Sequence, residues 1–417
     1  MVTYSVPKSA RQKPQTGWQL CDLAGQSVPL QAQTVRQAEQ TFNELTFLAN
    51  QVPGVGYRGY WLYPADATAG RTPPPPSTAP AAVLENELLR VSIDTRTGDI
   101  ACLLDKAQSR QVFSGPANQL QAFRDRGQYW DAWNIAPDYE SHPLPPAQLE
   151  SITWLERGPL RQRLAVVRQL GQSKITQHYI LDINSPLLKI ATWVDWQATQ
   201  VILKVNFPLT AEAEQATYET PFGTITRSTR SQTACEQAKW EVPALRWADL
   251  SAENAGVSLL TDCKHGFDAQ PNQLRLTLLK APLWPDPKAD RGQHHFTYAI
   301  YPHRGNWQQT PQQASALSLP LTTRTPETQA RNQLAAPAAR SFLQLSPANL
   351  VLAAFKPAED SADEFILRAY DASGQGGQLV QSNALGLAIA QPVNLLEQPV
   401  SSCPNRPYQI HTYRLKT

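Results

Sequence analysis

The property of this sequence that most constrains its fold is a short-range alternation of apolar and polar residues, repeated in brief runs that end in Asn, Asp, Pro or Gly. Successive side chains of a β-strand point to opposite faces, so a period of two is typical of antiparallel strands with one face buried. Proline supports this interpretation, because 35 of the 417 residues are proline, which interrupts helices and central strands. The expected strands cover residues 88–93, 174–180, 188–194, 201–207, 274–278, 296–302, 341–345, 350–355 and 365–370.

Helical periodicity is nearly absent, and it is weakly visible only in residues 31–44. Many short strands separated by turns predict an all-β protein built from β-sandwiches. The chain exceeds the usual size of one domain, and two stretches lack the alternation: a proline-rich one and one rich in Gln, Thr, Ala and Pro. We therefore predict a small β unit (1–65), a linker (66–82), a large sandwich (83–307), a crossing segment (308–340) and a C-terminal β unit (341–417).

Charge and cysteine content exclude several classes of protein. The net charge is +2 without a basic run, which argues against nucleic acid or an anionic membrane as the main partner. No apolar stretch is long enough to span a bilayer, and the first residues contain no apolar signal-peptide core. Five cysteines are scattered without C-x-x-C spacing, which is typical of reduced thiols in a cytoplasmic protein.

Residues 128–140, QYWDAWNIAPDYE, gather aromatic side chains around a carboxylate. Aromatic rings stack on the apolar faces of sugars, and a carboxylate accepts hydrogen bonds from sugar hydroxyls. This stretch therefore predicts a carbohydrate contact, in which the rings of Tyr129, Trp130, Trp133 and Tyr139 stack on the sugar and Asp131 accepts hydrogen bonds from its hydroxyls. The alternative is that the tryptophans pack against the protein and Asp131 caps a turn.

Two further polar clusters follow expected strands, one at residues 261–268 and one at 285–295. A Cys263–His265 nucleophile pair is conceivable in the first, but no third group that would orient it is evident. The histidines and cysteines lack zinc-ligand spacing, so we expect no metal or other cofactor in this chain. The sequence also lacks the motifs G-x-G-x-x-G, Walker A, H-E-x-x-H and G-x-S-x-G.

Several long segments together resemble one family of enzymes. They occur at residues 84–106, 128–135, 185–196, 217–227, 238–251, 256–268 and 275–303, and further similarity extends to 45–64 and 350–374. Their order and their amino-acid sequences resemble those of the C-terminal, all-β portion of the glycoside hydrolase family 38 α-mannosidases, in the cytosolic and bacterial branch. The resemblance implies a central galactose-mutarotase-like supersandwich flanked by two small β units.

The same resemblance implies that the catalytic chemistry lies elsewhere. Members of the family carry an N-terminal barrel with a zinc ion and an aspartate nucleophile, and they cleave with retention. None of the seven histidines here is followed two residues later by Asp, as in the metal-binding pair of that barrel. The interpretation is a C-terminal mannosidase half that is inactive alone. Its expected partners are a mannose-containing glycan and a separately encoded catalytic half.

By the same resemblance, Tyr129, Trp130, Asp131 and Trp133 would form a wall of the sugar site, with Asp262, Asp290 and Arg291 in neighbouring loops as secondary candidates. A split gene, a fragment and an independent module remain alternatives. An independent module would bind carbohydrate or act as a scaffold. A mutarotase, which needs a His/Glu acid–base pair, is a third possibility in which His178 or His294 would take part.

Overall fold

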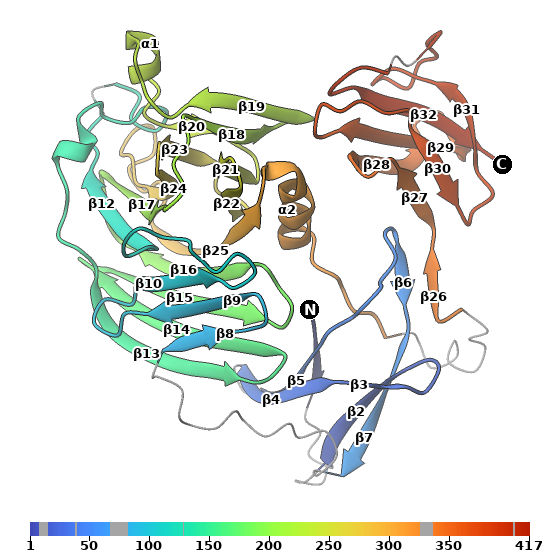
Figure 1. Cartoon of the computed structure of the whole chain (residues 1–417), viewed down its shortest axis with the longest axis horizontal. Helices are drawn as coiled ribbons and strands as arrows, with labels where there is room; N and C mark the ends of the chain where they lie inside the picture. Colours follow the sequence, from blue (N-terminus) through green and yellow to red (C-terminus); the bar gives the residue numbers. More distant parts are fainter. Residues whose placement is uncertain (8–15, 38–39, 67–81, 128, 326–336, 403–404) are drawn as a thin grey trace. The chain divides into compact units, whose positions relative to one another are not determined.

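The computed structural model describes the whole chain except residues 8–15, 38–39, 67–81, 128, 326–336 and 403–404. The described residues are mostly β-strands, which divide into two compact units (Figure 1). The large unit contains residues 72–219 and 225–320, and the small unit contains residues 1–71, 220–224 and 321–417. The domain boundaries expected from the sequence remain a prediction.

The large unit is built around an antiparallel sheet of nine strands. Its hydrogen-bonded order is β13 (Gln148–Arg157), β14 (Arg161–Leu170), β15 (Ser173–Asp182), β16 (Leu188–Trp196), β25 (Gly292–Arg304), β22 (Ala255–Thr261), β21 (Trp247–Ala252), β18 (Gln215–Thr220) and β19 (Gly223–Ser228). Along β15, buried and more exposed residues alternate, as the period of two requires. One face of this sheet therefore supplies the core.

Two smaller sheets share that core. A five-stranded sheet has the order β12 (Gln119–Arg124), β17 (Val201–Pro208), β24 (Gln273–Lys280), β23 (Gly266–Gln270) and β20 (Val242–Pro243). A four-stranded sheet has the order β11 (Arg110–Gln111), β10 (Ile100–Asp105), β9 (Leu89–Ile93) and β8 (Val83–Glu85). Val91, Val205 and Tyr179, one from each sheet, belong to the same buried cluster.

Helices are few among the described residues. The longest is α2 (Thr310–Ser318), which follows the short helix η2 (Trp307–Gln309). Its Ala314 and Leu317 pack with Trp247 and Tyr301 on the nine-stranded sheet. The remaining described helices are η1 (Tyr139–Ser141) and α1 (Ala234–Gln237).

The small unit contains two groups of sheets. Residues near the N-terminus form β1 (Val2–Pro7), β5 (Gln40–Phe47) and β4 (Leu30–Gln37) in one sheet, and β3 (Ser27–Val28), β2 (Thr16–Asp22) and β7 (Tyr60–Asp66) in another. The C-terminal residues form the sheet β28 (Leu350–Ala358), β29 (Ser361–Asp371), β32 (Ile410–Lys416) and β31 (Ala388–Pro392). Two pairs complete the unit: β26 (Ala339–Ser341) with β6 (Gly56–Arg58), and β27 (Leu343–Ser346) with β30 (Val380–Asn383).

All nine expected strands are confirmed, and they correspond to β9, β15, β16, β17, β24, β25, β27, β28 and β29. The weak helical expectation for residues 31–44 is wrong, because the described residues of this segment, 31–37 and 40–44, lie in the paired strands β4 and β5. Burial of Leu45 and Phe47 at the end of β5, together with the ladder between the strands, outweighs a weak local preference.

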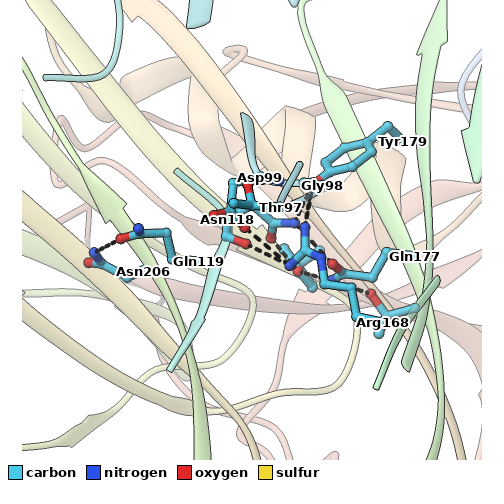
Figure 2. Close-up of polar contacts among 11 residues, drawn as sticks. Thr97, Gly98, Asp99, Asn118, Gln119, Arg168, Gln177, Tyr179 and Asn206 are labelled. Atoms are coloured by element: carbon cyan, nitrogen blue, oxygen red, sulfur yellow. Dashed lines mark hydrogen bonds and ion pairs between the residues drawn. The ribbon is translucent and has the colours of Figure 1, made fainter. Parts of the chain in front are cut away.

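A polar cluster lies in the interior of the large unit, and Figure 2 shows how its side chains point toward one another. Arg168 on β14 is 1% exposed and donates to the carbonyl oxygens of Gly98 and Asn118 and to the Tyr179 hydroxyl. Asp99 pairs with the same guanidinium at 3.3 Å. Burial raises the pKa of Asp99, and Arg168 only partly offsets this rise.

Gly98 is required where it lies. Its φ of +78° falls in the left-handed region, and an added Cβ would lie 2.4 Å from Cγ1 of Val166 and 3.0 Å from Nε of Arg168. The backbone of the turn between β9 and β10 is therefore in direct contact with the side chain of Arg168. One cation thus ties this turn to the nine-stranded sheet.

The small unit contains a buried carboxylate that yields a prediction about pH. Burial alone would raise the pKa of Asp371, but hydrogen bonds from Asn349 and from the amides of Gly376, Ser373 and Tyr408 outweigh it and hold the pKa below its ordinary value. A lowered folded pKa contributes stability above the unfolded pKa of about 3.9, and this contribution is lost as the pH falls through the folded pKa.

We therefore expect Asp371→Asn to lower the thermal unfolding midpoint at neutral pH, with a deficit that shrinks below about pH 4. Circular dichroism melts across a pH series measure this. Asp363→Asn, at an exposed position of the same strand, is the matched control and should show little deficit at any pH. A deficit that is independent of pH would contradict the prediction.

Candidate functional site

The aromatic segment follows β12, and strand order explains where it lies. β12 and β24 both pair antiparallel with β17, so they run parallel to each other. Arg124, at the end of β12, pairs with Val201, and Lys280, at the end of β24, pairs with the adjacent Ile202. Residues 125–147 and residues 281–291 therefore leave the same edge of the five-stranded sheet.

Buried contacts fix the first of these segments to the sheet. Asp125 is 3% exposed; its Oδ1 accepts the amide of Ala136 at 2.8 Å, and its Oδ2 pairs with Nζ of Lys280 at 2.7 Å. Phe123 and Tyr139 meet edge to face at 5.3 Å between ring centroids. Contacts of Asp125 and of Tyr139 thus fix residues 125–139 to the five-stranded sheet at two points.

Three indoles gather outside this anchor, and we call Trp130, Trp133 and Trp284 the tryptophan cluster. Their ring centroids lie 4.6 Å apart for Trp130 and Trp284, 5.5 Å for Trp133 and Trp284, and 6.3 Å for Trp130 and Trp133. The three side chains stay 59%, 67% and 47% exposed in numerical order, and the adjacent Tyr129 is also exposed. Such a group of exposed aromatic rings is typical of a binding surface.

Trp130 also has an unusual backbone. Its φ is 55°, in the left-handed region that a bulky L residue rarely adopts. Its carbonyl accepts the amides of Trp133 and Asn134, at 2.8 and 3.1 Å. A strained aromatic residue that is held in place by its neighbours is a feature often found at functional sites.

Asp131 differs from the aromatic residues beside it, because it is only 8% exposed. Its carboxylate accepts the amides of Leu283 at 2.8 Å and Trp284 at 3.0 Å, and its carbonyl accepts from Nζ of Lys280. Gly127 permits this, because an added Cβ would lie 3.0 Å from Cβ of Asp131. These contacts favour the alternative in which Asp131 holds a turn, while its expected contact with sugar hydroxyls remains a prediction.

Beneath the aromatic segment, buried lysine and arginine side chains of the five-stranded sheet form ion pairs with neighbouring carboxylates. Lys204 is fully buried between Glu241 and Asp268, and Asp268 also accepts from Arg275 at 2.6 Å. Burial alone would lower the pKa of Lys204, but the two carboxylates outweigh it and hold the pKa above its ordinary value. Burial raises the pKa of Tyr139, which covers these charges, to about 12.

Of the secondary candidates, Asp262 lies in the loop after β22, whereas Asp290 and Arg291 lie at the end of the segment that carries Trp284. Asp262 accepts the amide of Thr297 at 2.8 Å, and the Asp290 carbonyl contacts Nε2 of His294 at 2.7 Å. Arg291, next to Asp290 in the chain, is exposed. In the described part of the chain, no hydrogen bond, ion pair or ring contact joins Asp262, Asp290 or Arg291 to the tryptophan cluster. Their role in substrate binding remains a prediction.

The conceivable nucleophile pair gains no support from the contacts around it. Burial, followed by the hydrogen bond and charge of Asp262, raises the pKa of Cys263 to about 11, opposite to the shift of an activated thiol. His265 directs its Nδ1 to the carbonyl of Leu245 at 2.9 Å. Across the described residues, no three His, Cys, Asp or Glu side chains are arranged to hold a metal ion.

Two comparisons of sequence decide the family. Residues 84–288 match the Glycosyl hydrolases family 38 C-terminal domain, and residues 349–413 match the Glycosyl hydrolases family 38 C-terminal beta sandwich domain. The two matches together cover roughly two thirds of the chain. The chain belongs to glycosyl hydrolase family 38. This confirms the resemblance to the C-terminal portion of the family, and with it the all-β, multi-domain fold.

Relatives of this family-38 chain are α-mannosidases by name. Human Alpha-mannosidase 2C1 is 35% identical over 76% of this chain and 31% of its own length, and Dictyostelium discoideum Alpha-mannosidase G is 30% identical over 83% and 33%. The chain therefore spans about a third of the length of these relatives. The crystal structure of an α-mannosidase from Enterococcus faecalis V583 aligns with 99% of this chain and 54% of its own, with a TM-score of 0.77 at 16% identity. That likeness shows the same fold.

The zinc ion that the family implies finds no fitting set of ligands among the described residues. No helix in the described ranges is long and apolar enough to cross a membrane.

Trp284 is the residue that sequence reasoning missed. It lies in the loop sequence Pro282-Leu283-Trp284-Pro285, and a tryptophan between prolines in a polar loop cannot serve a regular strand core. The sequence therefore indicates an exposed tryptophan at this position, but nothing in it connects Trp284 to the distant Trp130.

Proposed function

We propose that this family-38 chain is the C-terminal part of an α-mannosidase, where it supplies a wall of the sugar site and a scaffold. The nucleophile and zinc would belong to a separate catalytic half, and the substrate would be a mannose-containing glycan in the cytoplasm. One observation carries the proposal: Trp130 and Trp133 are exposed on a segment whose base is buried and ion-paired. The names of the relatives support the choice of sugar.

The wall would act by stacking. The apolar C–H face of a pyranose ring covers an exposed indole, and water is released from both surfaces. Because the segment is held by buried contacts, little freedom is lost when the sugar binds. Tyr129 would flank the stacked ring, and Asp262, Asp290 and Arg291 would supply hydroxyl contacts from neighbouring loops.

Calorimetry and kinetics test this proposal. The purified chain should hydrolyse no aryl α-mannoside, whereas a complementary catalytic chain should restore zinc-dependent turnover. The chain alone should bind mannose oligosaccharides weakly, and Trp130→Ala or Trp133→Ala should reduce affinity about tenfold, because a stacked aromatic pair contributes about 1 kcal/mol beyond its buried area. Trp193→Ala, at a partly exposed tryptophan on the nine-stranded sheet, is the matched control. Turnover by the isolated chain, or an absence of binding, would contradict the proposal.

A stand-alone carbohydrate-binding or scaffold module is the second candidate, and the exposure of the tryptophan cluster favours it. The two functions differ in their response to a catalytic chain. A sugar-site wall should bind glycan more tightly once the catalytic chain is added, because the site is then complete. An independent module should keep the same dissociation constant.

A further inference from the structure

We infer that Trp284 is a third sugar-contacting residue of this wall, and that Asp131 is a positioning residue that holds Trp284 against Trp130. The inference rests on the proposed function. It assigns a role to a residue distant in the sequence from the aromatic segment, and it gives Asp131 a role other than contact with sugar hydroxyls.

The ring geometry places Trp284 in the wall. Its plane is inclined by 73° to that of Trp130 and by 59° to that of Trp133. In edge-to-face and tilted pairs, much of each ring's surface stays open. Trp284 accordingly remains about half exposed while it contacts both partners. A sugar stacked on Trp130 would therefore lie beside Trp284.

The contacts of Asp131 explain why Trp284 lies there. One carboxylate accepts two consecutive amides, those of Leu283 and Trp284, and so fixes the backbone from which the Trp284 ring extends. Both oxygens are engaged, and the side chain is almost fully covered, which leaves little of it for a ligand. Charge-assisted bonds of this kind are stronger than neutral ones.

Lys280 extends the same connection into the sheet. Its Nζ contacts the carbonyl of Asp131 and pairs with Asp125, which itself holds the amide of Ala136. The segment that carries Trp130 and the loop that carries Trp284 are therefore joined at one point by three charged residues. Loss of the Asp131 carboxylate should release the loop while the rest of this network stays in place.

Circular dichroism of the full chain tests the positioning role without any sugar. Neighbouring indoles give an exciton-coupled signal. The difference between wild type and Trp284→Phe isolates the part that involves Trp284, because the Trp130–Trp133 pair at 6.3 Å and the Trp247–Trp307 pair at 5.4 Å contribute to both proteins. Asp131→Ala should lose the same signal, and it should also lose about tenfold in affinity for mannose oligosaccharides. Trp284→Phe should weaken binding to a similar degree.

Asp138→Ala is the matched control, because Asp138 is an exposed carboxylate of the same segment that pairs with His142. It should leave both measurements unchanged. Asp131→Ala that keeps the signal but loses binding would make Asp131 a direct ligand and overturn the inference. Retention of both would overturn it as well.

Asp131→Asn keeps the size of the side chain but only one acceptor oxygen, so it provides the same readouts if the alanine variant does not fold. It should lose part of the signal and part of the affinity, and an unchanged signal would again contradict the positioning role. If the wild type binds no sugar, the proposed function fails, whereas the dichroism still decides whether Asp131 positions Trp284.

Discussion

Replacing Arg168 with methionine is expected to lower the free energy of unfolding of the large unit by about 3–5 kcal/mol, the usual cost of removing one partner from a buried ion pair. The side chain is 1% exposed and pairs with Asp99 in the interior cluster of Figure 2. Methionine fills a similar volume but donates no hydrogen bond. The carbonyl of Gly98 and the Tyr179 hydroxyl would then lose a buried donor.

Urea titration followed by tryptophan fluorescence measures this loss, because nine of the 11 tryptophans lie in the large unit. Arg96→Met is the matched control: the same substitution falls in the turn that Arg168 contacts, but at a side chain that is 86% exposed. It should change the midpoint little. Equal effects of the two substitutions would show that the buried cluster contributes no more than a surface pair.

Replacing Lys204 with methionine should cost a similar amount, about 3–5 kcal/mol, for a different reason. Lys204 is the buried cation between Glu241 and Asp268, and its removal leaves two negative charges facing each other in a site largely shielded from water. The cost should fall in acid, because protonation of either carboxylate removes part of that repulsion. Nζ of Lys204 also lies 5.4 Å from the centroid of the Tyr139 ring. Its removal should therefore weaken the packing of the aromatic segment against the sheet.

Urea titrations at several pH values test this second expectation. Lys174→Met provides the control, since Lys174 pairs with Glu150 on an exposed part of the nine-stranded sheet. A large loss for Lys204→Met that narrows as the pH falls, together with a small loss for Lys174→Met, is the expected pattern. A loss for Lys204→Met that is constant across pH would point to lost packing rather than to unpaired charge.

The strands could be predicted because burial on one face leaves a period of two in the sequence, as in β15 and β16. Helix α2 could not, since its sequence TPQQASALS has few apolar residues and no clear amphipathic pattern. It is stabilised where Ala314 and Leu317 meet Trp247. The helical prediction for residues 31–44 is wrong for a similar reason, because pairing between the strands β4 and β5, and not the local sequence, decides the structure there.

The site divides in the same way. Trp130 and Trp133 could be proposed from the sequence because they stand close together in a polar, proline-broken stretch. Trp284 could not be joined to them from the sequence, and neither could the two backbone amides that the Asp131 carboxylate accepts. The sequence shows which kinds of side chain are present, but it does not show which residue each of them contacts.

The sequence by itself determined the all-β class, the positions of nine strands, the family and two of the three members of the tryptophan cluster. Each of these depends on residues near one another along the chain. The tertiary structure alone decided that residues 125–147 and 281–291 meet, because β12 and β24 flank β17 and therefore end at the same edge of the sheet. Strand order arises from burial summed over the whole core, so no local pattern records it.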